Sequence, residues 1–332
     1  AFIFESSYPG VVIGPDEQKM GIKGSSTCQI YYNDVKVPVE NLLGKRGEGF
    51  RIALNILHMG RIKLGANVLG SAKKAIEDSV RYANERKQFG VLISSFGAIK
   101  HKLAEQVIRL FTCESAVYRV SRDIDDLTDT LLADCGDTGR ASIEAIGHYA
   151  VEAAILKVAG SEMLDYVSDE AVQIYGGMGY SAETDVERSY RDSRINRIFE
   201  GTNEINRLLV SDTAMKRAMK GDFDLFGKAA GLYAGLDNLL ETMAEGDDYY
   251  GEKSTYTGNF KKAILICIHG AVERYGRTLV HQQEVLNNIA DMIIETYLSE
   301  SLRLRVQKLE SLKSDLTVYR DILDVNIYDA AS

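Results

Sequence analysis

One short stretch of the sequence combines a carboxylate with apolar and flexible neighbours. In NRIFEGTNEINR, residues 196–207, Glu200 follows an Ile-Phe pair and precedes a Gly-Thr step. Burial among apolar side chains raises the pKa of a carboxyl group, which suits a base that takes a proton from carbon. The same stretch also fits a helix start, with Thr202 as N-cap and Glu204 in the first turn. Glu200 is then either a catalytic base or an exposed charge before a helix.

A second candidate lies in NERKQFGVLISSFGAI, residues 84–99, between two expected helices. Arg86 carries a planar guanidinium that can bind a pyrophosphate or a carboxylate. Gln88 can bind a phosphate or the edge of a heterocycle, and Phe89 can pack on a ring. The alternative is an ordinary basic helix end, in which Arg86 complements the helix dipole.

A glycine-rich turn occurs in VQIYGGMGYSAE, residues 172–183. Gly176, Gly177 and Gly179 can end a helix and let the backbone approach a ligand or another chain closely. A glycine-rich helix end is usually only a turn. The sequence of this segment does not fit a G-x-G-x-x-G phosphate loop, because no parallel strand is expected before it.

The residues that two other common kinds of catalytic site require are missing from the sequence. A di-iron site in a helical bundle needs paired Glu-x-x-His motifs, and none occurs in the sequence. The nearest pairs, Glu144 with His148 and His101 with Glu105, have the spacing of ordinary helix-surface pairs. A G-x-S-x-G nucleophile elbow is also missing from the sequence. We therefore expect neither a metal site nor a nucleophilic hydrolase.

Composition narrows the possible partners and the location. The 332 residues are 45% hydrophobic and carry a net charge of −9, which fits about two globular domains and argues against nucleic acid binding. No apolar run reaches the ~18 residues of a membrane helix, and the opening AFIFESSYPG lacks a signal-peptide pattern. Scattered cysteines predict buried free thiols in a reducing compartment. The expected location is the cytoplasm.

The prolines divide the chain into two kinds of segment. All of them lie at or before Pro38, and residues 1–45 are rich in β-branched and aromatic residues, which predicts strands and turns. In the remainder the apolar residues recur mostly at spacings of three and four, which predicts helices. Long helices with short connections indicate a bundle. The expected helices span residues 47–86, 96–126, 140–166, 168–175, 182–191 and 202–219.

A second helical unit is expected after this bundle. KGDFDLFGKAAG, residues 220–231, marks the boundary. The polar stretch EGDDYYGEKSTYTGN predicts a loop over residues 245–259. Helical patterns follow at about 259–281 and 284–324, so the closing part of the chain is an appended helical unit.

Together these pieces resemble the acyl-CoA dehydrogenase family. The resemblance covers about residues 1–218, and the appended unit favours the very-long-chain type. It implies a mainly α fold in which residues 1–46 are the C-terminal part of the middle β-domain, 47–219 form the four-helix-bundle FAD and catalytic domain, and 220–332 form a C-terminal helical extension. We expect the chain to be a C-terminal fragment. The matching segments are KMGIKGSSTCQIYYNDVKVPVENLLGKRGEGF, GRIKLGANVLG, YANERKQFG, AVQIYGGMGYSAETDVERSYRDSRI and RIFEGTNEINRLLV.

The resemblance assigns a reaction to Glu200. In the family, the matching Glu removes the α-proton of an acyl-CoA thioester while FAD accepts a hydride from the β-carbon, which yields the trans-2-enoyl-CoA. Some relatives carry the base just before the residue matched by Arg61, but that position is Gly60 here, which cannot act as a base. The resemblance also implies that Arg61 orders the substrate region and that Leu57 and Phe199 contact the substrate.

The resemblance further implies how FAD is bound. In the family the arginine loop and the Gln-Gly-Gly turn reach the flavin site of the neighbouring subunit, so we expect a homodimer or a dimer of dimers. Electron-transfer flavoprotein is the expected electron acceptor. The residues that match FAD contacts are Arg86, Gln88, Phe89, Gln173, Gly176, Gly177, Thr202 and Glu204.

Two other functions fit the same resemblance. An acyl-CoA oxidase shares the glutamate and the flavin but passes electrons to oxygen. A non-catalytic scaffold on the same fold would use the terminal helices to dock on a partner or a membrane. For residues 259–324, packing on the chain's own bundle or on a dimer mate is favoured over membrane contact. The isolated fragment is expected to bind FAD weakly and to turn over little substrate.

Overall fold

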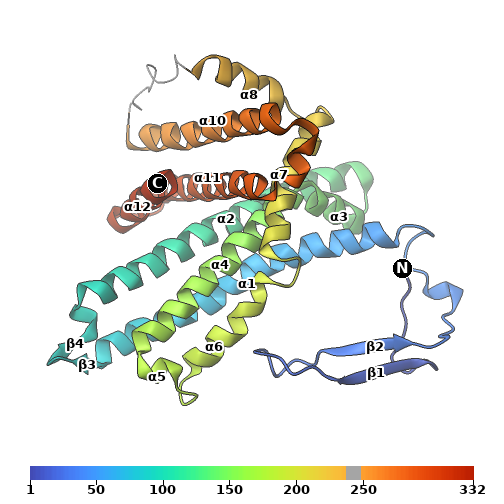
Figure 1. The fold of residues 1–332 in the computed structure, drawn as a ribbon, viewed down its shortest axis with the longest axis horizontal. Helices are drawn as coiled ribbons and strands as arrows, with labels where there is room; N and C mark the ends of the chain where they lie inside the picture. Colours follow the sequence, from blue (N-terminus) through green and yellow to red (C-terminus); the bar gives the residue numbers. More distant parts are fainter. Residues whose placement is uncertain (237–247) are drawn as a thin grey trace.

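The described part of the chain folds mainly into helices, which confirms the predicted mainly α fold. The computed structural model describes residues 1–236 and 248–332 (Figure 1). The α-helices are α1 (Gly49–Glu85), α2 (Gly97–Cys135), α3 (Thr138–His148), α4 (Ala150–Tyr175), α5 (Gly177–Tyr180), α6 (Asp185–Ser193), α7 (Asn203–Met219), α8 (Leu225–Ala234), α10 (Tyr249–Tyr275), α11 (Gln283–Leu309) and α12 (Thr317–Ala331). The 3-10 helices are η1 (Val39–Asn41), η2 (Ile93–Ser95), η3 (Arg194–Arg197) and η4 (Gly276–His281). The strands are β1 (Val11–Asp16), β2 (Cys28–Tyr32), β3 (Lys87–Gln88) and β4 (Val91–Leu92).

The N-terminal segment contains the strands that its composition predicts. β1 pairs antiparallel with β2, and the register shifts between Ile13 and Asp16. In Figure 1 this hairpin stands to one side of the helices. Ile13 and Tyr32 are more than half exposed, at 54% and 56%. The hairpin therefore adds little to the apolar core.

α4 is the central helix of the fold and packs against α1, α2 and α7. Glycines let α4 approach α1 closely. A Cβ at Gly65 of α1 would lie 2.9 Å from Cβ of Leu156, and a Cβ at Gly160 of α4 would lie 3.0 Å from Cγ2 of Val68. The two backbones therefore come near each other at this contact. This packing supports the predicted helical bundle.

The C-terminal helices pack onto this bundle and share its core. α11 contributes Ala290, Ile294 and Leu298 to the apolar cluster built by α1, α2 and α4. A second cluster joins α8, α10 and α11, and a third joins α10, α11 and α12. Figure 1 shows α11 and α12 lying across the bundle, with α10 and α8 beyond them. A domain boundary near residue 220 stays a prediction, and the helices on its two sides share one core.

Several predicted helix boundaries are wrong. The helix expected over residues 96–126 continues, as α2, to Cys135. The break expected after residue 166 lies instead at Tyr149, whose φ of −91° and ψ of 32° separate α3 from α4. The continuous helix expected at 284–324 is divided into α11 and α12 by a turn, in which Oδ1 of Asp315 accepts a hydrogen bond from the N–H of Thr317 at 2.9 Å. Neither break is marked by a proline, the residue that most clearly interrupts a helix in a sequence. The spacing of apolar residues alone does not reveal these breaks.

The polar loop predicted for residues 245–259 is wrong where the structure describes it. Residues 245–247 lie outside the described residues. α10 begins at Tyr249 because Asp248 is its N-cap, whose Oδ1 accepts a hydrogen bond from the N–H of Gly251 at 2.6 Å. Tyr250 then enters the third apolar cluster, which anchors this polar helix start to α11 and α12.

The described part of the chain contains neither a candidate metal cluster nor a membrane-spanning helix. In residues 1–236 and 248–332 no group of three or more His, Cys, Asp or Glu side chains could hold a metal ion. Within the same ranges no helix is long and apolar enough to cross a membrane. The prediction of buried thiols is correct for Cys113, whose pKa burial raises to about 12. It is wrong for Cys135 and Cys267, which are exposed, and Cys28 is only half-buried.

Candidate active site

Glu200 lies in a tight turn between η3 and α7. The φ of Glu200 is +59° and that of Gly201 is +85°, both in the left-handed region. A non-glycine residue adopts this conformation at a cost, and such strain is concentrated at functional sites. Thr202 is the N-cap of α7, since its Oγ1 accepts a hydrogen bond from the N–H of Ile205 at 3.4 Å. Glu200 therefore precedes the cap and stands outside the helix.

The carboxylate of Glu200 lies against α1 at Gly60. A Cβ atom at Gly60 would be 2.4 Å from Oε2 of Glu200 and 2.8 Å from Oε1. No side chain larger than hydrogen fits at this position while Glu200 keeps its conformation. The two positions that the family resemblance connects with the base thus face each other, and only Glu200 carries a carboxylate.

Arg61 fixes the backbone of the turn. Its Nε donates a hydrogen bond to the carbonyl oxygen of Glu200 at 3.1 Å, and the residue is only 5% exposed. Nη1 of Arg61 lies 3.4 Å from Nδ1 of His58. Burial, together with the charge of Arg61, lowers the pKa of His58, which favours the neutral imidazole. Arg61 is therefore the fixed positive charge beside the turn.

Three polar residues that the sequence analysis did not single out complete the turn. Nδ2 of Asn206 donates to the carbonyl oxygens of Gly201 at 2.8 Å and Thr202 at 3.0 Å. Nζ of Lys157, on α4, donates to Oδ1 of Asn203 at 2.6 Å, and both side chains are buried. One signal was present in the sequence. Asn favours turns over helices, so two Asn residues at a helix start indicate side chains that bind backbone groups.

The residues expected to contact the substrate lie near this turn. Leu57 is half-buried and precedes Arg61 by about one turn of α1. Phe199 directly precedes Glu200 and is 42% exposed. Phe199 lines a cavity of about 540 Å³ beside η3 and another of about 600 Å³ between α1, α4 and α6. The structure thus brings the predicted base and the predicted substrate contacts to one region.

One group of predicted FAD contacts lies at the far end of α1. Arg86, Gln88 and Phe89 belong to a loop closed by β3 and β4, which the sequence analysis did not predict as strands. At 1.5 Å per residue, α1 places this loop roughly 40 Å from Gly60. Phe89 is 92% exposed and has a φ of +50°. Its ring is therefore available to a ligand or to a second chain.

The glycine turn lies at the same end of the bundle. Gln173 lies in the last turn of α4, Gly176 follows that helix as its C-cap, and Gly177 begins α5. The hydroxyl of Tyr82 donates to the carbonyl oxygen of Tyr175 at 3.3 Å, and the two rings stack with centroids 4.0 Å apart. A Cβ atom built at Gly176 or Gly177 meets nothing within 4 Å. Figure 1 accordingly shows β3, β4 and α5 together at one end of the molecule.

Thr202 and Glu204 form the other group of predicted FAD contacts, next to the Glu200 turn. Glu204 is exposed in the first turn of α7, and hydrogen bonds from its own backbone N–H and from Thr202 lower its pKa. One chain therefore does not bring all the predicted FAD contacts into one site. This separation is what the family resemblance implies, because there the arginine loop serves the neighbouring subunit.

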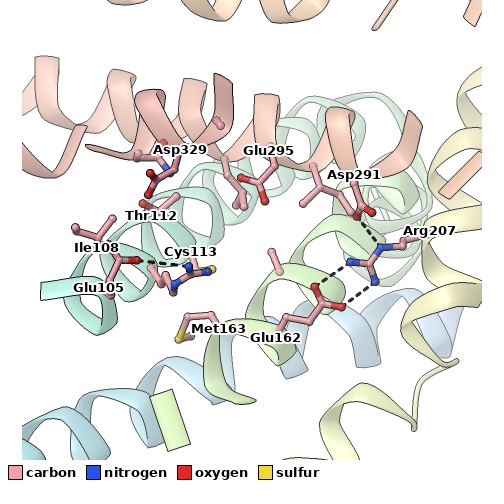
Figure 2. Close-up of a pocket in the computed structure, with 16 residues that line it drawn as sticks. Glu105, Ile108, Thr112, Cys113, Glu162, Met163, Arg207, Asp291, Glu295 and Asp329 are labelled. Atoms are coloured by element: carbon pink, nitrogen blue, oxygen red, sulfur yellow. Dashed lines mark hydrogen bonds and ion pairs between the residues drawn. The ribbon is translucent and has the colours of Figure 1, made fainter. Parts of the chain in front are cut away.

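A separate polar cavity of about 300 Å³ lies where α2, α4 and α7 meet α11 and α12. None of the predicted site residues lines it. Figure 2 shows Arg207 between Glu162 and Asp291, with Nη1 and Nη2 bound to the Glu162 carboxylate at 2.8 and 2.9 Å. Nε of Arg207 binds Asp291 of α11 at 2.6 Å. Burial raises the pKa of Glu295, which also lines this cavity. The cavity marks a polar junction between α2, α4 and α7 on one side and α11 and α12 on the other.

Comparison with known proteins identifies the same family along both helical parts of the chain. Residues 47–215 and residues 259–331 each match a family model described as acyl-CoA dehydrogenase, C-terminal domain. The chain is 44% identical over 310 residues to a probable acyl-CoA dehydrogenase of Bacillus subtilis, covering 93% of this chain and 52% of that protein. It is 40% identical over 238 residues to the mitochondrial very long-chain specific acyl-CoA dehydrogenase of Homo sapiens, covering 72% of this chain and 32% of that protein.

A solved structure matches nearly the whole fold. The crystal structure of acyl-CoA dehydrogenase complexed with FAD from Bacillus anthracis aligns with a TM-score of 0.93 at 44% identity, covering 99% of this chain and 56% of that chain. The chain spans about half the length of these bacterial relatives. The chain belongs to the acyl-CoA dehydrogenase family.

Proposed function

We propose that this chain supplies the catalytic base of a flavin-dependent acyl-CoA dehydrogenase, which converts a fatty acyl-CoA to the trans-2-enoyl-CoA. The observation that carries the proposal is the placement of Glu200. Its carboxylate lies against Gly60, its backbone is held in a left-handed turn, and Arg61 binds its carbonyl oxygen. A carboxylate whose backbone is fixed in this way is preorganised to meet a bound substrate.

Glu200 takes the α-proton of the thioester, and a hydride leaves from the β-carbon, so that the two carbons become joined by a double bond. FAD, when bound, accepts that hydride. Within residues 1–236 and 248–332, the backbone N–H of Glu200 has no acceptor. We propose that it donates to the thioester oxygen, where negative charge develops as the α-proton leaves. Phe199 helps exclude water from this point.

The residues of this chain that would bind FAD form two separate groups. The Arg86 loop offers an exposed guanidinium and the exposed ring of Phe89, while Gly176 and Gly177 leave open space for a close approach to the backbone. These groups lie far from the Glu200 turn of the same chain. We therefore propose a homodimer, or a dimer of dimers, in which the loop and the glycine turn of one chain complete the FAD site beside Glu200 of the other.

We further propose very-long-chain acyl-CoA as the substrate class and electron-transfer flavoprotein as the electron acceptor. The support for the substrate class is the similarity to very long-chain specific relatives and the helical extension that packs on the bundle. An assay with acyl-CoA thioesters of graded chain length, read by reduction of purified electron-transfer flavoprotein, tests both. Activity confined to short acyl chains would contradict the assigned substrate class.

Substitution of the base tests the proposal. Glu200→Gln keeps the size of the side chain but removes the base, so we expect kcat to fall by about 10²- to 10⁴-fold. The measurement is palmitoyl-CoA-dependent dye reduction by the full-length, FAD-loaded protein, with the flavin absorbance spectrum recorded to show that FAD is retained. Glu77→Gln, which changes an exposed carboxylate on α1, is the control and is expected to keep full activity. An active Glu200→Gln enzyme would contradict the assignment.

An acyl-CoA oxidase remains the second candidate, because it would use the same base and the same flavin. Stopped-flow measurement separates the two functions. After reduction by acyl-CoA, a dehydrogenase is reoxidised rapidly by electron-transfer flavoprotein and slowly by oxygen, and an oxidase shows the reverse order. A non-catalytic scaffold would show no reduction by any acyl-CoA.

A further inference from the structure

Lys157 is a charged side chain buried in the centre of the molecule. It lies in the middle of α4, is 0% exposed and is among the largest fully buried side chains of the described chain. Removing an ammonium group from water is costly unless polar partners compensate. The hydrogen-bond partner of Lys157 is not a carboxylate but the side-chain amide of Asn203. The buried ammonium group of Lys157 is therefore a candidate for a specific role.

The contacts of Asn203 leave its amide only one orientation. Nζ of Lys157 donates to Oδ1 of Asn203 at 2.6 Å, and Oγ of Ser161 lies 3.2 Å from the same oxygen. Nδ2 of Asn203 donates to Oε1 of Glu162 at 2.8 Å. The ammonium group can only donate and the carboxylate can only accept, so the amide cannot flip. Asn203 is 1% exposed, and water does not compete for these bonds.

Asn203 links this buried network to the candidate base. It is the first residue of α7 and lies three positions after Glu200. Lys157 thus holds the C-terminal end of the turn from α4, while Arg61 holds the carbonyl oxygen of Glu200 from α1. Nδ2 of Asn206 closes the turn from within α7. The left-handed backbone of Glu200 is therefore held from three helices.

The charges around Lys157 come from the elements packed against it. Glu162 lies on the same helix, Glu204 and Glu200 lie at the start of α7 and just before it, and Arg61 lies on α1. The carboxylates favour the protonated amine, and Arg61 opposes it. Burial is the largest effect and lowers the pKa of Lys157 to about 8. Near pH 7 the amine is still protonated and can donate.

We propose that Lys157 is a positioning residue for the catalytic base: through Asn203 it holds the turn at 200–203 so that the carboxylate of Glu200 stays against Gly60. Lys157 does not touch the reacting atoms. The inference rests on the proposed function for its effect on catalysis, whereas its effect on the turn can be measured without any activity.

Two variants separate the roles of Lys157. Lys157→Met keeps the length of the side chain but removes the donor and the charge, and Lys157→Gln restores a donor without the charge. The direct readout is amide hydrogen exchange of residues 199–206 in the full-length, FAD-loaded protein. In Lys157→Met we expect this exchange to become at least about tenfold faster, because the turn opens locally more often. Lys157→Gln is expected to recover part of this protection.

The kinetic readout follows from misplacement of the base. With palmitoyl-CoA, Lys157→Met is expected to lower kcat by about 10- to 100-fold, since small displacements of a reacting group have effects of that size. KM is expected to change by less than about threefold, because the substrate contacts are retained. If Lys157→Met does not fold, Asn203→Ala breaks the same link from the other side and is expected to give the same two results.

Val158→Ala is the matched control. Val158 is a buried neighbour on α4, so its truncation loosens the same helix without removing a contact to Asn203. We expect its exchange at residues 199–206 to stay near that of the unmodified protein. Equal exchange in all variants, or an equal rise in Val158→Ala, would overturn the inference. An active Glu200→Gln enzyme would instead overturn the proposed function, so the two failures are distinguishable.

Discussion

The carboxylate of Glu200 occupies the space that a side chain at position 60 would need, so the site requires glycine at position 60 as well as the carboxylate. Gly60→Ala would place a Cβ atom 2.4 Å from Oε2 of Glu200, which forces the carboxylate to move. Because the displaced atoms are the end of a flexible side chain, we expect the fold to survive and kcat to fall by about 10²-fold. The measurement is kcat with palmitoyl-CoA together with the free energy of unfolding in urea.

Gly70 on the same helix provides the control for this substitution. A Cβ atom at Gly70 meets nothing within 4 Å. Gly70→Ala should therefore keep full activity and stabilise the helix by roughly 0.5–1 kcal/mol, the usual gain from replacing a mid-helix glycine. If Gly60→Ala were as active as Gly70→Ala, the carboxylate of Glu200 would not need its observed position.

The lowered pKa of Lys157 also predicts that the free energy of unfolding depends on pH. Burial lowers the pKa of Lys157 in the folded protein to about 8, from the ordinary lysine value of 10.5. Between these two values the unfolded chain binds more protons than the folded one, so the free energy of unfolding rises with pH. The burial cost of the ammonium is fully present below about pH 8 and is relieved toward about pH 10.5, by at most about 3 kcal/mol.

Comparison with Lys157→Met isolates this contribution, because other groups titrate alike in both proteins. Between about pH 7.5 and about pH 10, we expect the free energy of unfolding of the unmodified protein to rise by about 1–3 kcal/mol more than that of Lys157→Met, measured by urea unfolding. Lys63→Met, on the exposed side of α1, should show no such difference. A parallel pH dependence of the unmodified protein and Lys157→Met would mean that folding does not shift the pKa of Lys157.

At the residue scale, the sequence was informative where a motif carries its own chemistry. Glu200 and the N-cap Thr202 could be singled out from the letters around them. Lys157 and Asn203 could not, because their importance comes from a contact between residues 46 positions apart. A lysine on an apolar helix usually marks a solvent-facing position, so only the packing of α4 against α7 reveals that this one is buried.

At the element scale, the long helices were predictable and their ends were not. Apolar periodicity without proline indicated α1 within two residues of its observed start at Gly49. The start of α10 depended on Asp248, a cap signal inside a stretch whose overall polarity indicated a loop. Burial of Tyr250 against α12 decides in favour of the helix, and tertiary contacts of this kind are invisible to a local pattern.

The length of α1 has a consequence for the site. The helix runs without interruption from the Glu200 region to the Arg86 loop, so a single chain cannot fold these two groups together. The family resemblance accounts for this separation by pairing two chains. Sequence patterns alone left Arg86 as either a ligand contact or an ordinary helix end, and gave no distance between Arg86 and Glu200. The unbroken length of α1 sets that distance.

At the scale of the whole molecule, α11 is joined to α4 and α7 by an ionic contact as well as by apolar packing. Arg207 of α7 binds both oxygens of Glu162 on α4 and one oxygen of Asp291 on α11, as Figure 2 shows. The side chain of Arg207 is 17% exposed and that of Asp291 is 47% exposed. The contact to Glu162 should therefore contribute more to stability than the contact to Asp291, which solvent screens.

Arg207→Met tests this junction, because it keeps the apolar stem and removes the charge that Glu162 and Asp291 share. We expect a loss of about 1–3 kcal/mol in the free energy of unfolding, since two carboxylates lose their partner. Asp291→Asn should lose no more than about 1 kcal/mol. Arg122→Met, at an ion pair whose arginine is 75% exposed, is the control and should stay within about 0.5 kcal/mol of the unmodified protein. Urea unfolding gives all three values. If Arg207→Met were no less stable than Arg122→Met, apolar packing alone would hold α11 against α4 and α7.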